Sequence, residues 1–149
     1  MKPWSYRLAL IASIVVAILQ FVPIDRRSPP ITSAATLNAT EAVPAQVQAV
    51  LVRSCRDCHS DETHWPWYSY VAPASWYISH DVHEARSKMN FSRWGTYSRS
   101  KRAHELEEIC NQLMDEKMPL PAYALLHPIA RLTQEDRAAV CEWTSSPRP

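Results

Sequence analysis

The residues with the clearest chemical potential lie between positions 55 and 59, where two cysteines separated by two residues are followed directly by a histidine. Cys55, Cys58 and His59 have the spacing at which a c-type haem is attached. Each thiol forms a thioether with one haem vinyl group, and the adjacent imidazole reaches the iron from one face. The alternatives are a lone disulfide, a redox-active cysteine pair and half of a zinc site. The sequence lacks both a βαβ pattern and a second, closely spaced ligand pair, so it favours one covalent haem c.

The composition limits the chain to one small domain without a nucleic-acid partner. Its 149 residues, less an apolar N-terminal segment, leave room for a single core. The 16 Lys and Arg residues nearly balance the 15 Asp and Glu residues, so there is no basic footprint for nucleic acid. One glycine against 12 prolines argues against hairpin-rich β architecture. We therefore expect an all-α domain with long loops.

The N-terminal segment is apolar enough to suggest contact with a membrane. Residues 1–24 predict an uncleaved anchor, in which residues 4–24 form one transmembrane helix about 31 Å long. A cleaved signal peptide is the alternative, but the end of the apolar run offers no small-residue cleavage site. The stretch 25–39, which contains prolines, serines and threonines, predicts a linker to a haem-binding domain at residues 40–145. Because c-type haem is attached on the outer face of the energy-transducing membrane, we expect this domain to face the periplasm.

Apolar residues at helical spacing predict the main helices of the domain. These helices are expected at residues 45–53, 75–89, 101–114 and 133–143. Val140 and Trp143 in the closing helix are expected to pack against the helix that leads to the haem motif. Met89 and Met114 are expected to fill gaps in the core, as methionine side chains often do.

The two cysteines outside the haem motif lie in the last two of these helices. Cys110 is central to the apolar stripe of its helix, and Cys141 lies in the closing helix. In an oxidising periplasm the two could form a disulfide, which is a possibility that the sequence leaves open beside two unpaired buried thiols.

Met118 is the candidate for the second axial ligand of the iron. Prolines at the following positions end the preceding helix and hold Met118 on a stiff, extended loop. A thioether opposite His59 stabilises ferrous iron and raises the reduction potential. His127 is the main rival, and an open or water-bound iron is the other alternative. His80 and His83 lie opposite the apolar stripe of their helix, so we expect them in solvent or at a partner surface.

A block rich in aromatic residues follows the haem motif. Its prolines exclude a long helix, so we expect a loop that lays Trp65, Trp67 and Tyr70 against the domain. An indole N–H or a phenol O–H from this block could then reach a haem propionate. Ordinary packing is the alternative role for these three side chains.

Several of these segments together resemble the bacterial haem-binding domain family. They are Cys55-Arg-Asp-Cys-His-Ser60, Glu62-Thr-His-Trp-Pro-Trp-Tyr-Ser-Tyr70, Asn90-Phe-Ser-Arg-Trp94, Met118-Pro119 and Leu126-His-Pro128. The resemblance extends to about Trp143 and implies a mono-haem, largely helical, membrane-tethered c-type domain. The order of haem motif, helices, Met-Pro loop and closing helix is also similar to class I cytochromes c. We therefore expect a single-pass protein of the bacterial inner (cytoplasmic) membrane.

These patterns together predict an electron carrier rather than an enzyme. No nucleophile or proton-transfer constellation is evident in the sequence. His59 and Met118 on the iron would suit single-electron transfer between redox partner proteins. The alternative is a haem-based sensor or gas-binding module with an open or weakly held sixth position. A haem peroxidase is disfavoured because there is no evident distal His/Arg arrangement.

Overall fold

The computed structural model describes residues 3–147, and its regular elements in that range are all helical. The α-helices are α1 (Pro3–Leu19), α2 (Leu37–Thr40), α3 (Ala45–Ser54), α4 (Arg56–His59), α5 (Ala74–Lys88), α6 (Arg99–Met114), α7 (Pro121–Leu126) and α8 (Gln134–Ser145). Short 3₁₀ helices occupy several connections, namely η1 (Ser33–Ala35), η2 (Trp67–Tyr70), η3 (Phe91–Thr96) and η4 (Pro128–Ala130). The expectation of an all-α chain is therefore confirmed.

The prediction of a transmembrane helix at the N-terminus is wrong. Among residues 3–147, no helix combines the length and the apolar character that crossing a membrane requires. Helix α1 has 17 residues, which corresponds to about 26 Å, whereas a hydrocarbon core is about 30 Å thick. The predicted span counted residues 20–24 as helix, but the N–H groups of residues 20–22 bond carbonyls three residues back, and no helix continues after them. Pro23 explains the early end, because the residue before a proline is disfavoured in the α conformation.

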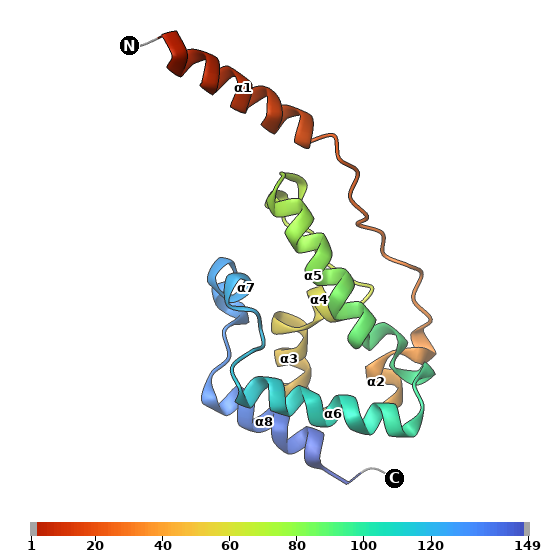
Figure 1. Ribbon diagram of the computed structural model, residues 1–149. Helices are drawn as coiled ribbons and strands as arrows, with labels where there is room; N and C mark the ends of the chain where they lie inside the picture. The colour runs from red at the N-terminus through yellow and green to blue at the C-terminus, as the bar shows by residue number, and fades with distance from the viewer. Residues whose placement is uncertain (1–2, 148–149) are drawn as a thin grey trace.

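The core of the domain lies where the middle and C-terminal helices meet (Figure 1). Helices α6 and α8 pack side by side at the base of the domain, and α3 packs against α8. Val140 and Trp143 of α8 are 0% and 5% exposed, which confirms that the closing helix packs into the core. The other core residues come from α2, α3, α6 and the segment around η3: Leu37, Val47, Val50, Leu51, Met89, Phe91, Trp94, Leu106 and Leu113.

The predicted amphipathic helices all form, with ends close to those expected. Helix α8 begins with a capping box, in which the Thr133 side chain and the Asp136 side chain each bond the backbone N–H of the other residue. Helix α6 is capped by Ser98, whose hydroxyl accepts from the N–H of Lys101. Met114 was expected in the core, but it is 65% exposed because it lies in the last turn of α6, past the buried Leu113.

The stretch between α1 and α3 contacts the domain at several points, although it is mostly extended (Figure 1). The carbonyl of Asp25 accepts a hydrogen bond from Ser79 of α5 at 3.0 Å, and the guanidinium of Arg26 lies over the Tyr70 ring at 4.3 Å. Gly95, the one glycine of the sequence, allows η3 to approach this stretch closely. A Cβ there would lie 2.9 Å from Thr40 Cγ2 and 3.1 Å from the backbone of Ala35.

The cysteines outside the haem motif are joined to each other. Cys110 of α6 and Cys141 of α8 form a disulfide, with their Cα atoms 4.9 Å apart. Packing of α6 on α8 brings the two half-buried cysteines together, a proximity that helical spacing alone could not establish. The bond ties the base of the domain across a loop of 31 residues.

We expect the double substitution Cys110→Ala/Cys141→Ala to lower the free energy of unfolding by about 3–4 kcal/mol, because a closed loop of this length restricts the unfolded chain. Urea denaturation monitored by circular dichroism measures the change. The oxidised wild type with and without a reductant provides the control. An unchanged denaturation midpoint would show that this bond contributes nothing to stability.

Candidate haem site

A cavity of about 530 Å³ opens between α5, α6 and the segment that follows α6. Its volume falls within the range of roughly 300–1,000 Å³ that is usual for ligand and cofactor sites. The cavity wall includes Cys55, Cys58, His59 and Met118, so the structure brings the four predicted haem residues to one site. Apolar side chains complete much of the remaining lining: Leu51, Ala85, Phe91, Ile109, Leu113 and Leu120.

The cysteines of the motif lie at the junction of α3 and α4. Cys55 follows the last residue of α3, and its N–H donates to the Leu51 carbonyl at 3.0 Å. Both Cys55 and Cys58 are free thiols. Burial and, to a smaller extent, the charge of Cys58 raise the pKa of Cys55 to about 12, and burial together with Asp57 raises the pKa of Cys58 to about 11. At neutral pH both sulfurs are therefore protonated.

His59 is oriented by a backbone carbonyl from the end of α5. Its Nδ1 lies 3.2 Å from the carbonyl oxygen of Met89, which can only accept, so Nδ1 carries the proton. Nε2 is then the nitrogen with a free lone pair, as metal ligation requires. Burial lowers the pKa of His59, which favours the neutral ring. Phe91 packs nearby, with its ring centroid 6.1 Å from that of the imidazole.

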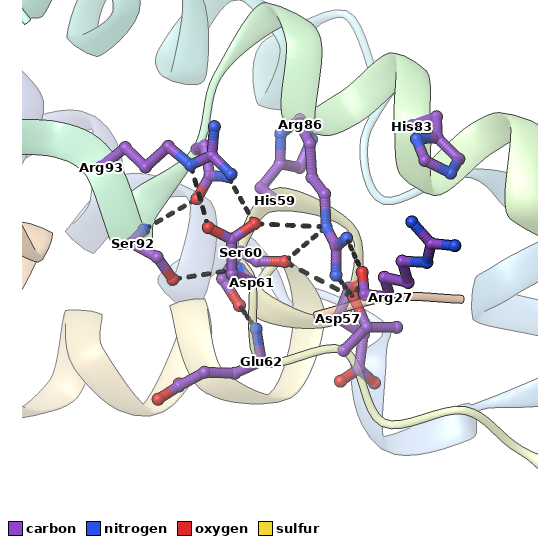
Figure 2. Close-up of polar contacts among 12 residues, drawn as sticks. Arg27, Asp57, His59, Ser60, Asp61, Glu62, His83, Arg86, Ser92 and Arg93 are labelled. Carbon is purple, nitrogen blue, oxygen red and sulfur yellow. Dashed lines mark hydrogen bonds and ion pairs between the residues drawn. The ribbon is translucent and has the colours of Figure 1, made fainter. Parts of the chain in front are cut away.

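The segment after His59 is fixed by a buried carboxylate (Figure 2). Asp61 is 3% exposed, and Figure 2 shows it between Arg86 of α5 and Arg93 of η3. Its Oδ2 accepts from Arg93 Nε at 3.0 Å, its Oδ1 accepts from Asn90 Nδ2 at 2.9 Å, and Arg86 Nε lies 3.8 Å from Oδ1. Its own N–H donates to Ser92 Oγ at 3.0 Å. These contacts hold the end of the motif against the segment that supplies the Met89 carbonyl.

Arg86 extends this network to the chain on both sides of the motif. It donates to the Ser60 carbonyl at 2.8 Å, to Thr63 Oγ1 at 2.7 Å and to the Arg27 carbonyl at 2.9 Å (Figure 2). Burial lowers the pKa of its guanidinium, and the attraction of Asp61 opposes that change. A largely buried cation with this many acceptors fixes the relative positions of the haem motif and α5.

Met118 reaches the cavity from a tightly closed helix end. Glu116 has a φ of 56°, in the left-handed region, and the N–H groups of Glu116 and Lys117 bond the carbonyls of Leu113 and Gln112. This pattern is a Schellman motif, which reverses the chain after α6. The N–H of Met118 also bonds the Gln112 carbonyl at 3.2 Å, and the half-buried Met118 side chain packs on the core.

His127, the rival ligand, is engaged elsewhere. Its Nε2 lies 3.0 Å from the Tyr68 hydroxyl and its Nδ1 lies 3.0 Å from the Tyr123 carbonyl. It is not among the residues that line the cavity. Both of its ring nitrogens have partners in the protein, and Met118 lies at the cavity whereas His127 does not.

The predicted aromatic block does not line the cavity. Trp67 and Tyr70 belong to η2 and are 78% and 57% exposed, and Trp65 is half-buried away from the cavity wall. The proline before η2 starts a short 3₁₀ turn that directs these side chains outward, so aromatic content alone gave no indication of their direction. The cavity takes its aromatic residues from Phe91 and Tyr123 instead.

Sequence reasoning also missed two histidines at the cavity. His80 of α5 and His104 of α6 both line it, from opposite walls, although both are exposed to solvent. His80 was expected on the solvent side of α5. That side of α5 also borders the cavity, because α5 and α6 leave the cavity open to solvent. His104 lies one turn before Glu108 on α6, and Glu108 also lines the cavity. Helical spacing from Glu108 could therefore have identified His104.

The residues of the cavity fit a haem. Two free thiols, a correctly protonated imidazole and a thioether share one largely apolar space of suitable size. The Ser54 hydroxyl, in the same wall, is buried without a hydrogen-bond partner in the protein, so a polar group of a bound molecule could satisfy it. The fold and the site thus define a small, all-helical haem-binding protein.

The comparison with family models agrees with this description. Residues 14–146 match the model of the haem-binding domain, and the chain therefore belongs to this family and binds haem. No curated protein and no solved structure gives a match to the chain.

We expect Asp61→Ala to lower the free energy of unfolding by roughly 3–5 kcal/mol, because it leaves the guanidinium of Arg86 buried without its counter-charge. Glu84→Ala, which removes an exposed ion pair with Lys88 on the same helix, should change it by no more than about 1 kcal/mol. Urea denaturation of both variants measures the difference. Equal effects of the two substitutions would contradict a structural role for Asp61.

Proposed function

We propose that this protein is a mono-haem c-type cytochrome that transfers single electrons, with His59 and Met118 as the axial ligands. The observation that carries the proposal is the convergence of Cys55, Cys58, His59 and Met118 on one cavity. The two thiols are free to form thioethers, and the hydrogen bond from His59 Nδ1 to Met89 leaves Nε2 for the iron. One cavity of this size accommodates one haem, attached covalently.

The residues around the site are suited to a carrier rather than to an enzyme. A bound haem supplies a reversible one-electron couple between ferric and ferrous iron. Met118 in the sixth position would leave no open site for a substrate, and its soft sulfur favours the ferrous state. The apolar part of the lining would limit water around a bound haem, and the hydrogen bond to Met89 would hold the His59 ring in one orientation. Redox partner proteins would therefore exchange electrons with the haem without binding to its iron.

We place the haem domain in the periplasm of a bacterium. The disulfide between Cys110 and Cys141 supports this location, because such bonds persist in oxidising compartments and are rare in the cytosol. Covalent attachment of haem to a Cys-x-x-Cys-His motif also takes place on that side of the membrane. The fractionation of a tagged full chain between cytoplasm and periplasm tests the location.

We expect Met118→Ala to remove the methionine–iron charge-transfer band of the ferric protein and to lower the reduction potential by on the order of 100 mV, a part of the roughly 0.8 V range that axial ligands control. The reduced variant should bind carbon monoxide readily. Visible spectra and a redox titration provide the measurements, and the matched control is Met114→Ala, which removes an exposed methionine at the end of α6.

The same experiment separates the carrier from a sensor or gas-binding module. A wild-type protein that lacks the methionine band and binds carbon monoxide as readily as Met118→Ala would have an open or weakly held sixth position. That result would overturn the assignment of Met118 and favour ligand sensing.

We expect the double substitution Cys55→Ala/Cys58→Ala to abolish covalent attachment. After extraction with acidified acetone, the wild type should retain its haem and the variant should release it completely. A mass spectrum of the intact wild type should show the mass of one added haem. Retention of haem by the extracted variant would rule out thioether attachment at this motif.

A further inference from the structure

Tyr123 connects the segment that bears Met118 to the haem motif itself. It lies on α7 and lines the cavity, and its hydroxyl donates to Asp57 Oδ2 at 2.9 Å across 66 residues of sequence. Asp57 is one of the two residues between Cys55 and Cys58. This hydrogen bond is therefore a direct link between the two sides of the haem site.

Both partners of this hydrogen bond are held by other contacts. Asp57 Oδ1 accepts from the N–H of His64 at 3.1 Å, and the Asp57 carbonyl accepts from Thr63 Oγ1 at 2.6 Å. The Tyr123 ring stacks on His127, with centroids 4.1 Å apart and planes 28° apart. The hydroxyl and the carboxylate therefore meet in a fixed geometry, which makes the contact a specific constraint rather than a chance surface pair.

The position of Met118 depends on anchors at both ends of its segment. At one end, the N–H of Met118 bonds the Gln112 carbonyl at the end of α6. At the other end, α7 begins at Pro121 and its Tyr123 is bonded to Asp57. Without the Tyr123 contact, this end of the segment loses its polar link to the haem motif.

We propose that Tyr123 is a positioning residue, whose hydrogen bond to Asp57 holds the Met118 segment against the iron. This inference rests on the proposed function, since it requires Met118 to be an axial ligand. Tyr123 acts through Met118 and does not itself bind the metal. It sets how strongly the methionine competes with other molecules for the sixth position.

The hydrogen bond persists over the physiological pH range. Burial, followed by the hydrogen bond to Asp57 and its charge, raises the pKa of Tyr123 well above the ordinary value of a phenol. The hydroxyl therefore remains a donor, and its acceptor is a carboxylate, which makes the contact stronger than one between two neutral groups.

The test is a titration of the ferric holoprotein with imidazole, followed by visible spectroscopy. Imidazole must displace Met118 to bind, so its apparent affinity measures how firmly the segment is held. We expect Tyr123→Phe, which removes only the hydroxyl, to bind imidazole about tenfold more tightly than the wild type. Tyr68→Phe is the matched control, because the Tyr68 hydroxyl pairs with His127 Nε2 in the same aromatic group, whereas it is the Tyr123 hydroxyl that donates to Asp57 Oδ2. Its affinity should stay within about twofold of the wild type.

Variants of the acceptor separate the hydrogen bond from a general loss of structure. Asp57→Ala should bind imidazole as tightly as Tyr123→Phe, and combining the two substitutions should add no further increase. Asp57→Asn retains an oxygen acceptor and should lie closer to the wild type. All variants should keep covalent haem after extraction with acidified acetone. Wild-type imidazole affinity in Tyr123→Phe, or an additive effect in the double variant, would overturn the positioning role.

Met118→Ala distinguishes a failure of the positioning role of Tyr123 from a failure of the proposed function. Loss of the methionine band in Met118→Ala together with wild-type behaviour of Tyr123→Phe would reject the role of Tyr123 alone. An unchanged spectrum in Met118→Ala would reject methionine ligation, and the role of Tyr123 would fall with it.

Discussion

The haem site depends on the ion pairs and hydrogen bonds of one buried carboxylate, that of Asp61. A charge in a poorly hydrated environment is stable only when it is paired, so the segments that supply its partners must stay together. Those segments are the end of the haem motif, helix α5 and η3. The same arrangement places the Met89 carbonyl beside His59, whose tautomer follows from it. The charge of Asp61 therefore helps to set the orientation of His59 from a position beside the cavity.

The opposite side of the site is organised by different forces. The Met118 segment depends on backbone hydrogen bonds at the end of α6, the left-handed conformation of Glu116 and the restricted torsions of the prolines. These are local constraints, whereas the Asp61 network joins distant parts of the chain. Helix α6 supplies the carbonyls that hold the segment and also one wall of the cavity. The position of Met118 is therefore set mainly by residues close to it in the sequence.

The sequence was informative where one short pattern determined the outcome. The haem motif, the amphipathic helices and the capping box could be predicted because each depends on neighbouring residues. The length of the N-terminal helix was overestimated, because Pro23 disfavours helix at residues before it that are themselves apolar. The direction of Trp67 and the contact between Tyr123 and Asp57 could not be predicted, because both arise from packing between distant segments. Asp61 likewise gave no signal, since one acidic residue after the motif has no pattern of its own.

The disulfide at the base of the domain also decides which sulfur atoms remain available for the cofactor. Any single disulfide among the four cysteines uses two of them, and only the bond between Cys110 and Cys141 leaves both motif thiols free. A disulfide between a motif cysteine and Cys110 or Cys141 would leave the motif with a single free thiol. The contact between α6 and α8 brings Cys110 and Cys141 together, whereas Cys55 and Cys58 lie at the haem cavity as free thiols. Helix packing thereby separates the bonded pair of cysteines from the free pair at the cavity.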